Sequence, residues 1–324
     1  MSPFLDAARL TAHRRRNLWH SLLLVGGIGL IMMVSSVLIW SWSGIIVAGV
    51  AIALVVGLGP RISPDAVMRL YRGQLVDVRS GVQLARLVEI LADRAELASH
   101  PRLYVIPSAT LNAFATGNPD RAAIGITEGL LRRLSLREVA GVLAHEMSHI
   151  RNNDLFVMGL ADAMTRFTQI LAYTGIVLAA FNIPAWFMDQ AMFSWYAVLL
   201  LYLSPTISSL LQLALSRSRE YDADGEAAAI TGDPLGLASA LQTLERYQGR
   251  FWEDMTLPVP ARRIPQPSIL RTHPDTRERI RRLEELGASP LPRRLNVVEE
   301  PMITIAGLGP AEMAPRWRWP GVWY

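Results

Sequence analysis

Two long stretches of the chain carry almost no charged side chains. Residues 17–60 contain no Asp, Glu, Lys or Arg, and residues 167–216 contain Asp189 alone. A bilayer core about 30 Å thick is crossed by about 20 apolar residues, so each stretch is long enough for two spans. Residues that suit turns lie at Trp40–Gly44 in the first stretch and at Asn182–Pro184 and Asp189–Gln190 in the second. The pattern predicts two helical hairpins with four transmembrane helices.

The arginines before the first stretch are also typical of a cleaved signal peptide. Such a peptide has an apolar region of about 7–15 residues that ends at small residues. The stretch from Asn17 is far longer and has no such cleavage site. We therefore expect retained membrane anchors.

Arginines flank both apolar stretches and are absent from their tips. The positive-inside rule then predicts that both termini and all polar segments lie on the cytoplasmic side. The flanking residues are Arg9, Arg14, Arg15, Arg16, Arg61, Arg69, Arg72, Arg79, Arg166, Arg217 and Arg219. The net charge is +4, and these arginines are dispersed along the chain instead of forming one basic patch. Contact with lipid headgroups therefore explains them better than a nucleic-acid partner does.

The polar segments alternate between strand-like and helix-like patterns. Ser135 followed by Glu138 is a capping box and predicts a helix from there to about Ile150. Helices are also expected at 77–97, 216–230, 235–247 and 274–286, and strands at 101–108, 109–117 and 121–127. This predicts an α+β fold, mainly helical with a small sheet. The expected division is a cytoplasmic N-terminus (1–16), a hairpin (17–60), a first half-domain (61–166), a second hairpin (167–216), a second half-domain (217–285) and a Pro/Trp-rich tail (286–324).

The segment AGVLAHEMSHIRNND places two histidines four residues apart with a glutamate between them. On a helix, His145 and His149 share one face, about 5–6 Å apart between Cβ atoms, and suit one zinc ion. Glu146 is placed to take a proton from a water at that ion. A metzincin would need Gly at 152 and His at 155, but the chain has Asn and Leu there.

A third ligand is expected on a second helix, in LSRSREYDADGEAA. Glu220 would complete a His, His, Glu set that leaves an open position, as in catalytic zinc sites. Asp224, one helical turn later, is expected to accept the other ring N–H of a histidine ligand. Glu226 is the competing ligand and Asp222 a weaker one. Asp154 is expected either to support the ligands or to end the helix.

Four motifs in order resemble the HtpX heat-shock membrane metallopeptidases, relatives of the CAAX prenyl proteases. They are LNAFATG, HEMSHIRNND, SRSREYDAD and THPDTRERI, and the resemblance covers residues 15 to 285. It implies a gluzincin-like zinc endopeptidase of the bacterial inner membrane that degrades misfolded or damaged membrane proteins at the cytoplasmic face. It also implies His145, His149 and Glu220 as ligands of one Zn²⁺ and Glu146 as the catalytic base.

The resemblance gives roles to two further segments. Asn112, Ala113, Phe114 and Ala115 would form an edge strand that pairs with an extended substrate. His273 and Arg279 would stabilise the oxyanion of the tetrahedral intermediate.

Two other functions compete with proteolysis of damaged membrane proteins. A non-catalytic zinc-stabilised scaffold or sensor would not need a base such as Glu146 beside an open position. A processing peptidase for prenylated C-termini would enclose a chamber with more spans than four. The expected partners are unfolded or membrane-protein substrates and the lipid bilayer, with a regulatory membrane partner or a second copy of the chain left open.

Overall fold

The computed structural model describes residues 7–58, 63–77, 81–188, 194–254, 276–288, 295, 317–318 and 322–323. The chain forms two compact units, each built from separate pieces of sequence. We call residues 1–7, 62–155 and 219–324 the sheet unit, and residues 8–61 and 156–218 the apolar unit. The elements, in chain order, are α1 (Ala7–Trp40), α2 (Ser43–Leu58), α3 (Pro64–Leu70), β1 (Gln74–Leu75), α4 (Val82–Arg94), β2 (Arg102–Ile106), β3 (Ala113–Asn118), β4 (Arg121–Thr127), α5 (Glu128–Leu131), α6 (Leu136–Arg151), α7 (Asp154–Phe187), α8 (Trp195–Thr231), α9 (Pro234–Asp254), α11 (Thr276–Gly287), β5 (Trp317–Arg318) and β6 (Val322–Trp323).

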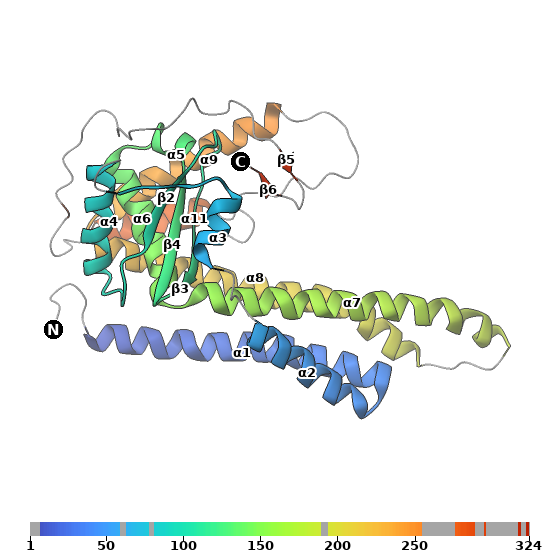
Figure 1. The fold of residues 1–324 in the computed structure, drawn as a ribbon. Helices are drawn as coiled ribbons and strands as arrows, with labels where there is room; N and C mark the ends of the chain where they lie inside the picture. Colours follow the sequence, from blue (N-terminus) through green and yellow to red (C-terminus); the bar gives the residue numbers. More distant parts are fainter. Residues whose placement is uncertain are drawn as a thin grey trace. The chain divides into compact units, whose positions relative to one another are not determined.

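The sheet unit is built on four strands in the order β1-β2-β4-β3 (Figure 1). Strands β2 and β4 are parallel, whereas β1 and β3 pair antiparallel with them. Strand β3 therefore lies at an edge of the sheet. The mixed sheet and the surrounding helices confirm the α+β class expected from the sequence.

Alternation along the central strands separates two faces of the sheet. Leu103 and Val105 of β2 join the main core, which also takes in residues of α4, α6, α9 and α11. Tyr104 between them faces the opposite side, with Met68 of α3. Because successive side chains of a strand point to opposite faces of the sheet, α3 packs on one face and the larger helical layer packs on the other.

Helix α6 is anchored at its first residue. The Ser135 side chain accepts a hydrogen bond from the Glu138 backbone N–H, and Glu138 accepts one from the Ser135 N–H, as the sequence predicts. Most of the helix is buried, and it packs against α4, α9 and β3. The HExxH segment therefore sits on a helix held on several sides.

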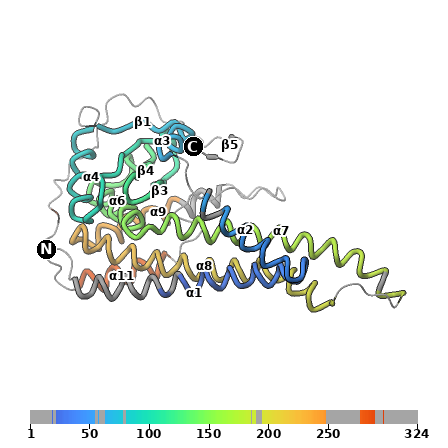
Figure 2. The backbone as a smooth tube through the Cα atoms, turned by 60° about the horizontal axis from the view of Figure 1, so that its bottom comes forward, coloured from blue at the N-terminus to red at the C-terminus, as the bar shows by residue number. Residues whose placement is uncertain are grey.

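The apolar unit contains helices long and apolar enough to cross a membrane. Among the described residues there are three, Leu22–Trp40, Asp154–Pro184 and Trp195–Thr231, and α2 is a shorter apolar helix. Figure 2 shows α1, α7 and α8 running alongside one another, and Ile28, Met164 and Leu215 pack into one cluster. The four-span hairpin arrangement stays a prediction.

Small residues allow close approaches in the apolar unit. The turn between α1 and α2 has Ser41 at φ 54°, and a Cβ on Gly44 would lie 2.2 Å from the Ser36 carbonyl oxygen. A Cβ on Gly175 would lie 2.8 Å from Leu201 Cβ. Glycine at these positions lets helix backbones come together, as is common in membrane bundles.

Several predicted boundaries differ from the structure. Helix α7 runs through Asn182–Pro184, where a break was expected, and ends at Phe187, so Pro184 limits the helix to less than one further turn without breaking it at Asn182. Asn112 precedes β3 instead of lying in it. Residues 216–230 form the end of one long helix, α8, that begins at Trp195. The second expected turn at 189–190 and most of the 286–324 tail lie outside the described residues.

Candidate metal centre

Helices α6 and α8 bring together three side chains suited to a metal. The Nε2 atoms of His145 and His149 are 3.2 Å apart. Glu220 of α8 places one carboxylate oxygen 3.3 Å from the first of these nitrogens and the other 3.5 Å from the second. These three residues are the one such group of His, Cys, Asp or Glu side chains among the described residues.

The spacing of these atoms fits a tetrahedral zinc ion. Ligand atoms at about 2.0–2.1 Å from zinc and at tetrahedral angles lie about 3.4 Å from one another. The two imidazole nitrogens are 3.2 Å apart, and the two oxygens of Glu220 lie 3.3 and 3.5 Å from one nitrogen each, close to this value. His145 and Glu220 are also buried, with 4% and 6% of their surface exposed, so these polar groups are not solvated by bulk water.

The charged side chains around the histidine pair also favour a divalent cation. Four buried acidic side chains and two buried guanidinium groups surround it, so the acidic groups outnumber the arginines by two. The residues are Glu146, Asp154, Glu220 and Asp224, with Arg219 and Arg279. A divalent cation held by neutral histidines would balance this excess of acidic groups.

Each histidine is held at its other ring nitrogen by a carboxylate. His145 Nδ1 lies 3.1 Å from Asp224, and His149 Nδ1 lies 2.9 Å from Asp154. Burial alone would lower the pKa of His145, but its hydrogen bonds with Asp224 and Glu220 outweigh burial and raise it. Such carboxylate–histidine pairs fix the ring orientation so that Nε2 faces the ligand cluster.

Glu146 lies between the histidine pair and the edge strand. It is 6% exposed, and burial raises the pKa of its carboxyl group. The two histidines and a hydrogen bond from the Ala115 backbone N–H offset part of this effect. A glutamate with a raised pKa beside two imidazoles is suited to accept and return a proton near neutral pH.

Comparison with known proteins places this geometry in a family. Residues 80–287 match the model of Peptidase family M48. The chain belongs to this family. A "Protease HtpX homolog" of Acaryochloris marina is 37% identical over 282 residues, covering 81% of this chain and 92% of the relative. Proteins of the same name in Desulfatibacillum aliphaticivorans (35% identical; 75% of this chain, 82% of the relative) and Campylobacter hominis (38%; 74% and 90%) are also similar.

Membership of family M48 identifies a metalloprotease, and the relatives together with the apolar helices make it an HtpX-like membrane protein. Among solved structures, the crystal structure of S. mikatae Ste24p is 19% identical with a TM-score of 0.41. The match covers 86% of this chain and 66% of that one, just under two thirds of its length.

The structure separates the candidate third ligands that the sequence of this M48 chain left open. Glu226 accepts hydrogen bonds from Ser148 Oγ at 2.7 Å and Asn152 Nδ2 at 2.9 Å. It is therefore engaged away from the histidine pair, and neither Glu226 nor Asp222 belongs to the cluster. Glu220 is the ligand that this geometry favours.

Arg279 reaches the site, but in a different setting from the one expected. It is 2% exposed, and its Nε and Nη2 donate to Asp224 at 2.7 and 2.6 Å. Its Nη1 lies 3.3 Å from Glu220. This arrangement favours holding Asp224 over contact with a substrate oxyanion, and the oxyanion role stays a prediction. His273, its expected companion, lies outside the described residues.

The sequence reading missed Arg219, which it took for a residue that flanks the membrane. The side chain is 7% exposed and pairs with Asp154. Its position directly before Glu220 is no signal by itself, because adjacent side chains on a helix do not face each other.

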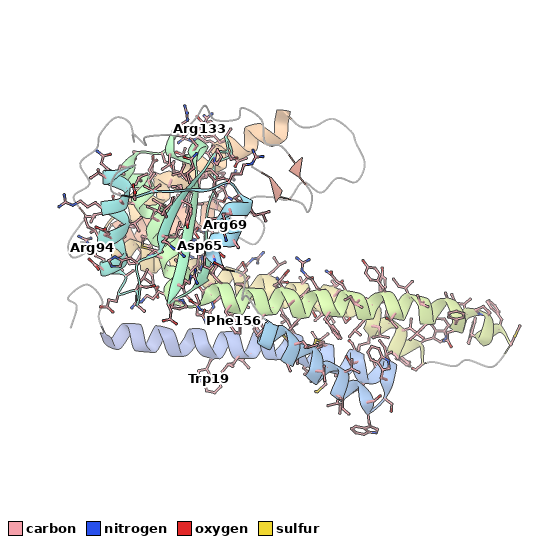
Figure 3. The ribbon with its side chains drawn as sticks, viewed as in Figure 1. Trp19, Asp65, Arg69, Arg94, Arg133 and Phe156 are labelled. Carbon is pink, nitrogen blue, oxygen red and sulfur yellow. The ribbon has the colours of Figure 1, made fainter. Side chains whose placement is uncertain are left out.

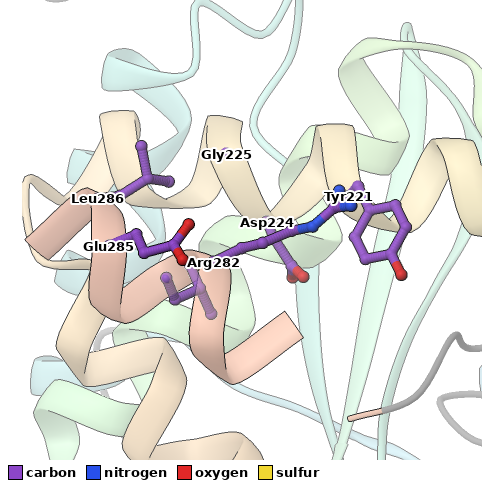
Figure 4. A pocket seen from close by; sticks show the side chains of 7 residues that line it. Tyr221, Asp224, Gly225, Arg282, Glu285 and Leu286 are labelled. Atoms are coloured by element: carbon purple, nitrogen blue, oxygen red, sulfur yellow. The ribbon is translucent and has the colours of Figure 1, made fainter. Parts of the chain in front are cut away.

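A cavity of about 340 Å³ lies between α8 and α11, beside the cluster's supporting residues (Figure 4). Asp224 lines it, and the Arg282 guanidinium covers the Tyr221 ring at 3.8 Å from its centroid. None of the three ligand residues lines this cavity. We therefore assign it no part in the chemistry.

Proposed function

We propose that this chain is a zinc endopeptidase that hydrolyses peptide bonds of misfolded or damaged membrane proteins at the cytoplasmic face of the bacterial inner membrane. The observation that carries the proposal is the convergence of His145, His149 and Glu220 within 3.2–3.5 Å, with Glu146 beside them. Three protein ligands of this kind leave a position for a water and a substrate, which is typical of catalytic zinc sites.

Zinc bound by these residues would supply a Lewis acid for the water and for the scissile carbonyl. Glu146 then acts on the proton: its carboxylate takes it from the attacking water and passes it to the leaving amine. Asp224 and Asp154 hold the imidazole rings through their Nδ1 atoms. The chain thus contributes a base and a fixed ligand set.

Strand β3 is suited to bind an extended substrate. Asn112 and Thr127 form a hydrogen-bonded pair, with the Thr127 N–H donating to the Asn112 carbonyl at 2.9 Å. Since such pairs alternate along an antiparallel ladder, Ala113 and Ala115 direct their N–H and C=O groups away from β4. The hydrogen bond from the Ala115 N–H to Glu146 agrees with this register. A substrate strand added at this edge would run beside Glu146.

The apolar helices support a location in a bilayer. The arginine-free tips and arginine-rich flanks favour two hairpins with four spans and cytoplasmic termini. The proposed ligands stand on both sides of the second expected hairpin in the sequence, His145 and His149 before it and Glu220 after it. Substrates would be unfolded cytoplasmic segments of membrane proteins.

A non-catalytic zinc scaffold is the competing function. It would use the same three ligands, but it has no need of a buried glutamate hydrogen-bonded to an edge strand. The position of Glu146 therefore favours proteolysis over the scaffold. A CAAX-type processing peptidase would use the same chemistry, and prenylated peptides test it directly.

Cleavage of casein by the detergent-purified full-length chain tests the proposal. Wild type should hold about one zinc per chain and cleave, because the described residues offer one ligand cluster. Glu146→Gln should keep the zinc and lose activity by at least about 10³-fold, since it removes the base but no ligand. Glu138→Gln, on the same helix and outside the cluster, is the matched control.

Zinc binding by wild type without cleavage of casein or of an unfolded membrane-protein segment would favour the scaffold. Cleavage of prenylated peptides alone would favour the processing peptidase. Full activity in Glu146→Gln would remove Glu146 from the mechanism.

A further inference from the structure

Behind each histidine of the cluster lies a carboxylate that is itself paired with an arginine. His145 leads to Asp224 and then to Arg279, and His149 leads to Asp154 and then to Arg219. No sequence motif gives a role to Arg219. Its contacts in the structure do.

Asp154 makes two contacts that together fix its carboxylate. One oxygen lies 2.9 Å from His149 Nδ1, and Arg219 Nη1 donates to the other oxygen. Because the two oxygens have different partners, the carboxylate cannot rotate without losing one of them. The orientation of the His149 ring is therefore set by Arg219 as well as by Asp154.

Both members of this ion pair are buried. Asp154 is 2% exposed and Arg219 is 7% exposed. A buried carboxylate is costly without an opposite charge beside it. Arg219 supplies that charge on one oxygen, while the other oxygen faces His149 Nδ1.

The local backbone brings the pair together at the start of α7. Helix α6 ends at Arg151, and Asn153 adopts φ 55°, a conformation that asparagine tolerates better than most residues. This turn places Asp154, the first residue of α7, back beside His149. Arg219 comes from α8, directly before Glu220.

We propose that Arg219 is a positioning residue of the metal centre, which acts through Asp154 to direct Nε2 of His149 at the metal. The proposal rests on the zinc site described above. Asp154 and Arg219 also stand at two of the four points where the sequence passes between the sheet unit and the apolar unit.

Zinc affinity of the full-length protein, measured by competition with a chelator, tests this role. Arg219→Gln and Asp154→Asn should each lower the affinity by about 10–100-fold, the usual effect of losing a residue that supports a ligand. Because both substitutions remove the same Arg219–Asp154 contact, the zinc affinity of the double variant should be no lower than that of the single variants. Arg219→Lys, which keeps the charge, should recover part of the affinity.

Two further readouts separate positioning from a general loss of folding. The visible spectrum of the cobalt-substituted protein should change in Arg219→Gln, because the His149 ring is no longer fixed. The metal-free double variant, which leaves no unpaired charge, should melt close to metal-free wild type. Arg246→Gln removes the same charge at an exposed position of the sheet unit and should match wild type in every readout.

The outcomes also separate this inference from the proposed function. Wild-type affinity and an unchanged cobalt spectrum in Arg219→Gln would overturn the positioning role, as would additive losses in the double variant. Zinc binding by wild type without any cleavage would instead overturn the proteolytic function and leave the role of Arg219 intact.

Discussion

The two units of the molecule bury polar groups in different ways. In the sheet unit, most of the buried charged side chains gather around one histidine pair, and Glu128 and Asp233 are buried elsewhere beside Arg132 and Arg137. In the described part of the apolar unit, the buried polar side chains are hydroxyls and one amide, with no buried charge. They are Ser35, Ser36, Thr165, Thr168, Asn182, Ser204, Ser208 and Ser216.

The difference follows from the cost of burying each kind of group. A hydroxyl can donate to a carbonyl of its own helix, as Thr168 does to Thr165 at 2.7 Å and Ser204 to Leu201 at 2.8 Å. A buried charge needs an opposite charge, and at the site this comes from another helix, as for Asp154 with Arg219 and Asp224 with Arg279. A cluster of buried charges from several elements therefore marks the functional site, whereas the buried polar groups in the described part of the apolar unit carry no charge.

The largest effect is expected from Arg279. Arg279→Gln would leave Asp224 and Glu220 without their buried partner, and breaking such a pair costs about 3–5 kcal/mol. We expect a large fall in melting temperature and a loss of zinc. Arg282→Gln is the matched control on the same helix, because its side chain is 48% exposed and its loss should cost under about 1 kcal/mol. Equal effects in the two variants would contradict the comparison.

The edge strand offers a change that affects activity more than stability. Ala115→Pro removes an N–H that points away from β4, so no ladder bond is lost. We expect kcat/KM for casein to fall about 10-fold or more, because the variant removes the hydrogen bond that this N–H donates to Glu146, with zinc content unchanged. Thr116→Pro, which does break the ladder, should instead lower the melting temperature. Unchanged kcat/KM in Ala115→Pro would show that Glu146 does not depend on its contact with this edge.

Part of this organisation follows from the sequence. The capping box at Ser135 and Glu138 starts α6 as expected, because its contacts involve neighbouring residues only. The HExxH spacing also places His145 and His149 on one helical face by local geometry alone. Family membership confirms the resemblance that the four motifs indicate.

Other features depend on how distant segments pack. Glu220 and Glu226 lie on one helix, and only the packing of α8 against α6 directs the first to the histidines and the second to Ser148. Arg219 looks like a membrane-flanking arginine until Asp154 is placed beside it. Sequence spacing does not contain these contacts between helices.

A surface ion cluster outside the site gives a smaller, pH-dependent effect. Asp65 of α3, near the sheet in Figure 3, accepts hydrogen bonds from Tyr104, Arg102 and Arg121. Partial burial would raise the pKa of Asp65, but these bonds outweigh it and lower the pKa from 3.8 to about 2. The fold therefore favours the ionised form.

The pKa of Asp65 is lower in the folded state than in the unfolded state. Its contribution to the stability of the fold is therefore complete above about pH 4 and is lost as the pH falls toward 2. Asp65→Asn should lower the melting temperature at pH 7 by a few degrees. The difference from wild type should shrink steadily below pH 4. A difference that does not change with pH would show that the charge of Asp65 is not what stabilises α3.

The smallest effect is expected from a buried hydroxyl of the apolar unit. The Ser208 hydroxyl is fully buried and has no hydrogen-bond partner in the described structure. Ser208→Ala should therefore change the free energy of unfolding by under about 0.5 kcal/mol, measured in detergent. A loss above about 1.5 kcal/mol would mean that this hydroxyl takes part in a polar network of the apolar unit.

The central claim is that helices α6 and α8 together hold one metal ion through Glu220. Zinc content of purified Glu220→Gln and Glu226→Gln tests it most directly, because the two variants change the same residue type on the same helix. We predict that Glu220→Gln loses the zinc and that Glu226→Gln keeps about one zinc per chain. Retention of zinc by Glu220→Gln, with loss in Glu226→Gln, would contradict the account.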